Sequence, residues 1–543
     1  MEQFYIDNPL VLLFVVAAIG YLIGKVNFKG VSLGVAAILF VGLAFGAMYP
    51  GVDIPSILVQ LGLVLFVYSV GINSGRVFFD SIRKNGSRDI LFGVLMLTIS
   101  AALAIGIHYG FSFDAATTTG IYTGSTTNTP ALAAVIEQIS NKMGNEASTI
   151  SELAVVAYSF TYPMGVMGAI IAILILERFY KINYAQEMES ISEKYNVATN
   201  LTSSTILITN EEVNGLSKRE LFAKHKWNVV FGRYTSDGDN VLLPNWDTVF
   251  KTGDQIMVVG PKKELNKVAE FLGEFSENKL SRDRRFLDVR RIFVSNPHVV
   301  GKTLSELQLD RKFAAVVTRI RRGDVDMLAK GDTVLQLGDR ARFVAKREDL
   351  DALSNFFGDS YYEASSLNLF SFGLGIALGL LLGTIEFALP GGINFRLGLA
   401  GGPIIVSLIL GALQRTGPIV WTLPYSVNVT LRQMGLIIFL AVIGIGSGPA
   451  FFESIQGSAG VMVFVGGVII SVFTALLTII IGYKLIKIPF TLILGIISNQ
   501  PAVLEFALNR TKNNLPLIGY TMIFPISLIL KIVYAQLLFL VLS

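Results

Sequence analysis

The sequence predicts a polytopic α-helical membrane protein made of two inverted-topology repeats, with a pair of small α+β domains inserted between them. Three observations predict this class. Apolar residues make up 52% of the 543 residues and charged residues only 15%, and the mean hydropathy is +0.59. The apolar residues gather into stretches long enough to cross about 30 Å of hydrocarbon, which takes about 20 helical residues. These stretches form two blocks on either side of a charged insert, and motifs recur between the blocks.

Each block contains five predicted spans and one leftover, half-polar segment. In the first block the spans lie near 9–25, 31–49, 57–78, 89–110 and 151–177. In the second block they lie near 367–388, 399–414, 433–451, 458–482 and 515–541. The leftover segments, 114–138 and 489–509, are each predicted to be a re-entrant hairpin, which enters and leaves the membrane on one side.

Basic residues set the expected orientation. Lys25 and Lys29 follow the first span and Arg83 and Lys84 follow the third, whereas the loops after the second and fourth spans contain no Lys or Arg. Positive residues favour the cytoplasmic side, so the N-terminus is expected outside. A complete crossing by 114–138 would carry the basic insert outside, which favours a hairpin. The C-terminus is then also expected outside, and residues 181–365 inside.

Three motifs are repeated between the blocks in the same order. Residues 61–79 align without gaps on 434–452, and TNTPAL at 127–132 matches SNQPAV at 498–503. YSFTYPMG at 158–165 matches YTMIFPIS at 520–527. Weak internal repeats of this kind are typical of secondary transporters.

The hairpin tips are the predicted substrate site. Gly124 and Pro130 interrupt the first hairpin and free backbone groups, which must line a cavity or bind a ligand because lipid cannot satisfy them. Helix N-termini at such a break favour a carboxylate, and unwound carbonyls favour a cation. The alternative is a kink whose hydroxyl groups only satisfy the local backbone. The predicted binding residues are Gly124, Ser125, Thr126, Thr127, Asn128, Thr129 and Pro130 in the first tip, and Ser498, Asn499, Gln500 and Pro501 in the second.

Several polar residues inside the predicted spans extend this site. Lys531 lies in the middle of the last span, where burying a charge is costly. It either holds a substrate carboxylate, stands in for a cation, or pairs with an acid such as Glu505. Tyr158 and Tyr520 are candidate hydrogen-bond donors to substrate, with aromatic packing as the alternative. Two arginines flank the duplicated Gly-rich helix and are predicted to be gating residues or interfacial anchors: Arg76 and Arg432.

The insert is itself duplicated. VFKTGDQIMVVG at 249–260 matches VLQLGDRARFVA at 334–345, and Arg233 and Arg319 occupy equivalent positions before probable turns. Short alternating strands followed by helical segments predict two small α+β domains. No GxGxxG motif is present, so a complete nucleotide-binding Rossmann domain is not expected. The predicted domains are a membrane repeat at 1–180, a linker at 181–204, α+β domains at 205–278 and 279–356, and a membrane repeat at 357–543.

The duplicated insert motif resembles the TrkA C-terminal (RCK-C) domain, present twice. Two such domains between inverted halves that carry GSTTNTPAL and SNQPAV resemble the aspartate:alanine exchanger family. The resemblance implies a homodimer in the bacterial inner membrane that exchanges amino acids or dicarboxylates. Both termini would then be periplasmic, and the RCK-C pair would serve a small regulatory ligand or dimerisation. The tips are also similar in kind to those of sodium-coupled dicarboxylate transporters, although TNT and SNQ replace the Ser-Asn-Thr pattern.

The predicted function is therefore antiport of amino acids or small dicarboxylates by an elevator-like alternating-access movement. The alternatives are an RCK-regulated potassium transporter or channel, for which no TVGYG-like filter is present, and a sodium-coupled dicarboxylate symporter. An enzyme is the least expected class, because no nucleophile–base constellation occurs. The chain has no Cys and three scattered His, so neither a metal site nor a cofactor is expected, and a net charge of +4 does not indicate nucleic-acid binding.

Overall fold

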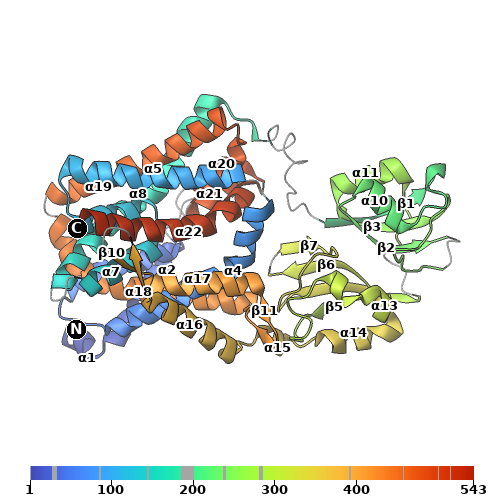
Figure 1. Ribbon diagram of the computed structural model, residues 1–543, viewed down its shortest axis with the longest axis horizontal. Coiled ribbons are helices and arrows are strands. Elements are labelled where there is room, and N and C mark those ends of the chain that lie inside the picture. The colour runs from blue at the N-terminus through green and yellow to red at the C-terminus, as the bar shows by residue number, and fades with distance from the viewer. Residues whose placement is uncertain are drawn as a thin grey trace. The chain divides into compact units, whose positions relative to one another are not determined.

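The computed structural model divides the chain into two compact units (Figure 1). The membrane unit comprises Met1–Val197, Phe372–Ala412 and Asn428–Ser543, and the insert unit comprises Ala198–Ser371 and Leu413–Val427. The residues described are 2–26, 34–84, 87–142, 146–184, 187, 201–236, 240–280, 285–323, 325–389, 393–455, 458–498, 501–513 and 515–543.

An apolar helix lies at each of the predicted spans. They are α2 (Pro9–Gly24), α3 (Ala37–Met48), α4 (Ser56–Lys84), α5 (Ser87–Phe111), α8 (Ala147–Tyr180), α16 (Leu369–Thr384), α17 (Gly398–Leu413), α18 (Tyr425–Ile455), α19 (Ser458–Ile480) and α22 (Leu515–Leu542). Within the described residues, six helices are long and apolar enough to cross a membrane, and α22, bent by 42°, makes a seventh. The helices α2, α3 and α17 are shorter apolar helices. The protein is thus a multi-pass helical membrane protein, with fewer full-length spans than the ten predicted.

Two predicted spans have different limits in the structure. The span expected at 367–388 ends at Thr384, because the chain continues into strand β9 (Glu386–Leu389), which pairs antiparallel with β10 (Ile393–Arg396). The span expected at 433–451 begins earlier, at Tyr425. Hydropathy missed this first part because it contains polar Asn428. That side chain is buried and donates to the carbonyl oxygen of Ser69 at 2.8 Å, so helix α18 can continue through it.

The two helices that carry the first sequence repeat, α4 and α18, cross at equivalent glycines. A Cβ added to Gly62 would lie 2.8 Å from the carbonyl oxygen of Gly435, and one added to Gly435 would lie 2.6 Å from that of Gly62. Such distances are too short for any side chain. Small residues at helix crossings let backbones approach closely, which supplies much of the packing energy inside a membrane.

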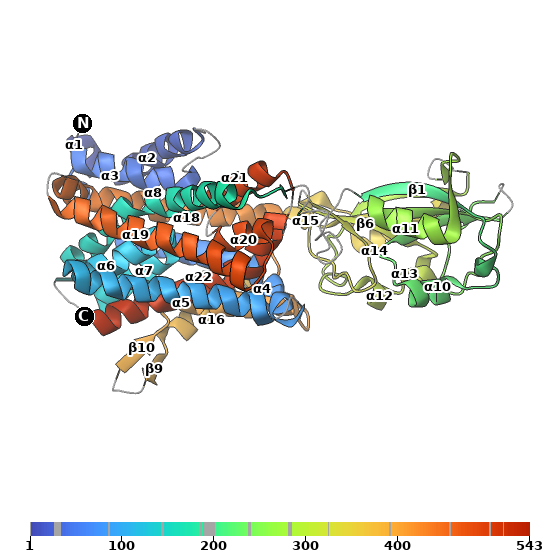
Figure 2. The same ribbon diagram turned by 90° about the horizontal axis from the view of Figure 1, so that it is seen from above.

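The two leftover segments each form a pair of short helices. The first pair is α6 (Ala115–Ser125) and α7 (Thr129–Lys142), and the second is α20 (Phe490–Ile497) and α21 (Pro501–Thr511). Each helix is shorter than a membrane crossing at about 1.5 Å per residue. Figure 2 shows α6 and α7 beside α22, against which they pack.

Carboxylates cap the first helix of each pair. Asp114 accepts a hydrogen bond from the backbone N–H of Thr117 at 2.7 Å and so caps α6. Glu187 accepts from the backbone N–H groups of Phe490 and Thr491, at 2.5 and 3.0 Å, and so caps α20. Negative groups at helix N-termini satisfy free N–H groups and the helix dipole.

The insert unit contains two four-stranded antiparallel sheets of related topology. The first has the order β2-β3-β1-β4, from β1 (Leu201–Ile208), β2 (Val230–Thr235), β3 (Gln255–Pro261) and β4 (Gly273–Ser276). The second has the order β5-β8-β6-β7, from β5 (Leu287–Phe293), β6 (Val316–Arg322), β7 (Val325–Leu328) and β8 (Arg340–Lys346). Helices α10 (Lys218–His225) and α11 (Lys262–Leu272) accompany the first sheet, and α12 (Leu304–Leu307), α13 (Leu309–Phe313) and α14 (Leu350–Phe357) accompany the second.

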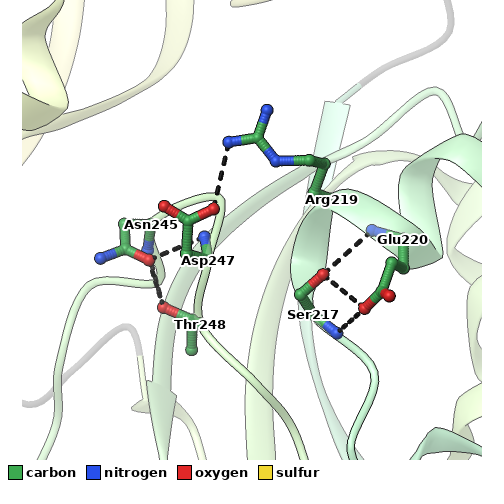
Figure 3. Close-up of polar contacts among 6 residues, drawn as sticks. All are labelled: Ser217, Arg219, Glu220, Asn245, Asp247 and Thr248. Carbon is green, nitrogen blue, oxygen red and sulfur yellow. Dashed lines mark hydrogen bonds and ion pairs between the residues drawn. The ribbon is translucent and has the colours of Figure 1, made fainter.

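The same capping box begins α10 and α12. Ser217 and Glu220 form it at α10, where the backbone N–H of Ser217 donates to the Glu220 carboxylate at 2.7 Å (Figure 3). Thr303 and Glu306 form it at α12. This motif satisfies two N–H groups reciprocally. Its recurrence accounts for the likeness of VNGLSKREL at 213–221 to VVGKTLSEL at 299–307.

Lys218, next to the first capping box, is an isolated buried cation. Its ammonium donates to the carbonyl oxygen of Pro244 at 3.1 Å and lies 5.0 Å from the centre of the Trp246 ring. Burial lowers the pKa of Lys218 to about 8, although nearby Asp310 opposes the shift. The equivalent position after the second capping box is Leu304. The fold itself therefore does not need a lysine here.

We expect the insert unit to gain stability as the pH rises from 8 to 10. In that range the unfolded state, with an ordinary lysine pKa near 10.4, binds more protons than the folded state, so the free energy of unfolding rises with pH, by up to about 3 kcal/mol. All three tryptophans, Trp227, Trp246 and Trp421, belong to the insert unit, so tryptophan fluorescence of the full chain follows its melting. Lys218→Leu should flatten the rise and Lys262→Leu, on the exposed face of α11, should not. Equal pH dependence in wild type and Lys218→Leu would contradict the assignment.

Candidate functional site

The last helix places a buried ammonium group at the break between α6 and α7. Lys531 of α22 is 2% exposed, and its Nζ donates to the carbonyl oxygen of Thr126 at 3.0 Å. In an uninterrupted helix this carbonyl would accept from the residue four positions later, which is Pro130. Because proline has no N–H, it cannot donate to this carbonyl, which accepts instead from Lys531 and from the Thr127 hydroxyl, the latter at 2.8 Å. The donor that Pro130 lacks is thus replaced at the Thr126 carbonyl by the ammonium group of Lys531.

A small cavity of about 50 Å³ lies beside Lys531. Both broken helices reach it, the first through Ser125 and Thr126 and the second through Ile496 and Ile497. Its other walls come from α5, α8, α19 and α22. The polar side chains of the lining are Ser100, Ser125, Thr126, Ser471, Thr474, Thr478 and Lys531.

The hydroxyl groups at the tips donate to their own segments. Ser125 donates to the carbonyl oxygen of Ile121 at 2.6 Å, and Thr126 to that of Tyr122 at 2.8 Å. In the second tip the Ser498 hydroxyl donates to the carbonyl oxygen of Leu494 at 2.5 Å. This is the local satisfaction that the kink interpretation expects. It uses the hydroxyl protons only, so the oxygens can still accept hydrogen bonds from a ligand.

Thr474 differs from the other hydroxyls of the lining. Its Oγ1 is buried and has no hydrogen-bond partner in the described part of the chain. Buried polar groups are normally satisfied, and each exception calls for an explanation. A ligand or water in the cavity would supply the missing partner.

Asn128 fastens the first tip to its surroundings. Its Oδ1 accepts from the backbone N–H of Ala131 at 3.1 Å and thereby caps α7, and its Nδ2 is 3.4 Å from the carbonyl oxygen of Leu528 on α22. Thr127, just before it, has φ +52°, a left-handed conformation that threonine rarely adopts. The break is therefore a defined turn rather than a frayed helix end.

Other predicted site residues lie around the tips but do not line the cavity. Tyr158 of α8 shares a hydrogen bond of 2.8 Å with Thr129, and Tyr520 of α22 stacks on Phe524. Gly124 packs against α8, where an added Cβ would lie 3.0 Å from the Cα of Tyr158. Whether either tyrosine donates a hydrogen bond to substrate stays a prediction.

The remaining predicted residues fall in three groups. Asn499 and Gln500 lie outside the described residues, as does the side chain of Pro501, which begins α21. Glu505 also has no described side chain, so its pairing with Lys531 stays a prediction. Arg76 near the end of α4 and Arg432 in α18 do not line the cavity.

Sequence reasoning missed the α19 wall of the cavity. Ser471, Thr474 and Thr478 recur at intervals of three and four residues, which places them on one face of the helix. That spacing was a usable signal, because hydroxyls on one stripe of an otherwise apolar span indicate an interior, polar face. Ser100 on α5 has no such pattern around it.

Comparisons with known proteins agree with this architecture. The family model described as a predicted permease membrane region, Asp-Al_Ex, matches residues 12–178 and 371–540, and a TrkA-C domain model matches residues 289–358. An uncharacterized transporter of Geobacter sulfurreducens is 44% identical over 542 residues, 99% of each chain. Uncharacterized transporters of Symbiobacterium thermophilum (43% over 540 residues, 99% of each chain) and Corynebacterium diphtheriae (38% over 545 residues, 98% of each chain) are similar along their whole length.

These matches cover both apolar blocks and the insert, and they confirm the family resemblance inferred from GSTTNTPAL, SNQPAV and the TrkA C-terminal pattern. The chain belongs to the aspartate:alanine exchanger family of predicted permeases and is a membrane transporter with a TrkA-C domain in its insert.

Proposed function

We propose that this transporter is an antiporter that exchanges amino acids or small dicarboxylates by alternating access, without sodium. The observation that carries the proposal is the buried Lys531 ammonium beside a cavity that both broken helices reach. The proposal includes the cytoplasmic insert, the periplasmic termini and the homodimer expected from the sequence, with the two α+β domains forming an RCK-C pair.

The buried Lys531 is the reason for proposing an anionic substrate. An ammonium group carries three N–H donors, and the bond to Thr126 uses one of them. Within the described residues, Lys531 has no carboxylate partner, and burying a charge without one costs several kcal/mol. A substrate carboxylate in the cavity would supply the missing charge. The unpartnered Thr474 hydroxyl can donate to the same carboxylate.

The two broken helices support exchange that does not depend on a coupling sodium ion. Helix α6 ends at Ser125 and α20 ends at Ile497, and both ends line the cavity. The carbonyl ends of helices carry partial negative charge and attract cations. Because the Lys531 ammonium already occupies the end of α6, it takes the place of a coupling cation there. This favours exchange over sodium symport.

Alternating access requires movement, because the cavity beside Lys531 must open to each side of the membrane in turn. We propose that the broken helices and the duplicated Gly-rich helices α4 and α18 form a core that moves against a scaffold of the outer spans. The TrkA-C match favours a second candidate, a regulated potassium transporter, but a buried lysine beside the cavity would repel potassium.

Counterflow in proteoliposomes tests the proposal. Vesicles loaded with one unlabelled amino acid or dicarboxylate should take up the same labelled compound without a sodium gradient. Uptake that requires a sodium gradient would contradict exchange and indicate sodium symport. Potassium flux in the absence of any counterflow would favour the second candidate.

Lys531→Met should lower the affinity for an anionic substrate about 10- to 100-fold, because it removes a charged hydrogen bond. Binding is measured by titration of the purified protein, and transport by counterflow. Lys484→Met is the matched control, since Lys484 lies over the Tyr180 ring and away from the cavity. A Lys531→Met protein that transports anions at the wild-type rate would contradict the assigned role.

Gly165→Ala should reduce transport at least about tenfold in a protein that still folds, because a few tenths of an ångström matter at a preorganised site. A Cβ on Gly165 would lie 2.7 Å from the carbonyl oxygens of both Gly124 and Ser125, and so would displace the first tip. Gly106→Ala on α5 is the control, since nothing lies within 4 Å of its Cβ. Equal transport by the two variants would mean that the position of the tip does not limit the cycle.

A further inference from the structure

Five arginines lie side by side on one face of the second sheet of the insert unit. The strand register pairs Arg291 with Arg342 and Arg342 with Arg319 in one cross-strand row, and Arg340 with Arg321 in the next. We call these residues the arginine face. The opposite face of the sheet is the core of the domain and carries Ile292, Ile320, Ala341 and Phe343, all fully buried.

Such an arrangement is unfavourable by itself. Like charges directly opposite each other on neighbouring strands repel and destabilise a sheet. One carboxylate, Asp326 of β7, joins the five arginines around a hollow of about 50 Å³. Arg319 and Arg342 form its half-buried floor, and Arg291, Arg321 and Arg340 are exposed at its rim.

The duplicate domain shows that the fold does not require these arginines. In the first sheet the row equivalent to Arg291–Arg342–Arg319 is Thr205–Met257–Arg233. The positions equivalent to Arg340 and Arg321 hold Gln255 and Thr235.

Only the Arg233/Arg319 position keeps its arginine, and both residues follow a bulge in their strands. The other four arginines are additions to a common framework. The repulsion among these arginines destabilises the sheet, and the fold does not require them. Their presence therefore indicates a function.

Arg319, on the floor of the hollow, offers a hydrogen-bond donor to a ligand. The Nε of Arg319 is buried and, within the described residues, has no hydrogen-bond partner. Arg319 and Arg342 also line a second hollow, where the two sheets of the insert unit meet and where Arg233 is fully buried. Burial lowers the pKa of Arg319, and the charge of Arg291 adds to that effect while Asp326 opposes it. An anion bound here would relieve this repulsion.

We propose that the arginine face is a binding site for a small soluble molecule that carries two or more phosphate groups. Guanidinium groups bind phosphate through paired N–H donors, and several of them converge on one hollow that is open at its rim. A single carboxylate needs no more than one or two such groups. Bound across β5, β8 and β6, the ligand joins three strands and reaches the floor shared with the first domain, so its binding stabilises the insert unit.

The test is titration of the full chain, in nanodiscs of zwitterionic lipid, with inorganic pyrophosphate. Saturable binding and a higher melting temperature of the insert unit, followed by tryptophan fluorescence, are expected. The double substitution Arg340→Gln with Arg342→Met installs the residues of the first domain. It should lower the affinity for pyrophosphate at least about 30-fold. Without ligand, the melting temperature of this variant reports whether it folds, since it loses the contact of Arg340 with the Phe293 ring as well as the repulsion.

The matched control is Arg290→Gln. Arg290 is on the same strand as Arg291 but pairs with Asp351 at 2.7 Å, so its loss should change the affinity by no more than about twofold. Absence of pyrophosphate binding, or an equal loss of affinity in the control, would each overturn the proposal. Tighter binding of succinate than of pyrophosphate would contradict the assignment of a phosphate ligand. Loss of pyrophosphate binding in nanodiscs that contain phosphatidylglycerol would overturn a soluble ligand in favour of lipid headgroups.

Discussion

The membrane unit depends on one constraint: a buried ammonium group must find oxygen partners inside an apolar bundle. Pro130 creates such a partner, because it cannot donate to the carbonyl oxygen of Thr126, and Lys531 donates to that carbonyl at 3.0 Å. The contact fixes α22 against the α6–α7 break and places the end of α6, with its partial negative charge, beside a positive one. The bond to Thr126 uses one of the three N–H donors of the ammonium group.

Close backbone approach lets the elements around this contact come together. Gly62 and Gly435 let α4 and α18 cross without side chains between them, and Gly165 gives the first tip room against α8. Because water is absent from the bilayer interior, helix association there depends on such packing and on hydrogen bonds.

The insert unit shows how one framework supports two surfaces. Both sheets bury the same kind of aliphatic face and begin a helix with the same capping box. Their other faces have diverged, since Met257 in the first sheet stands where Arg342 stands in the second. The aliphatic face is packed inside each domain. The other face is buried at Met257 in the first sheet, where the two sheets meet, and is exposed at Arg291, Arg321 and Arg340 in the second. A charged row on that face therefore points to a ligand rather than to stability.

The sequence alone determined the class of the protein, the positions of its apolar helices, the two helix breaks and the family, and it singled out Lys531 as a charge inside a span, because hydropathy, proline and glycine placement and charge inside an apolar stretch are local signals. It did not determine the partner of that lysine. Nor did it find Ser100, or the cross-strand row of Arg291, Arg342 and Arg319. Only the tertiary structure decided these features, because they depend on which residues, distant in sequence, meet across a helix crossing or a strand register. Segments such as the start of α18 were missed for the same reason: a polar Asn428 is tolerated there only because Ser69 offers it a carbonyl.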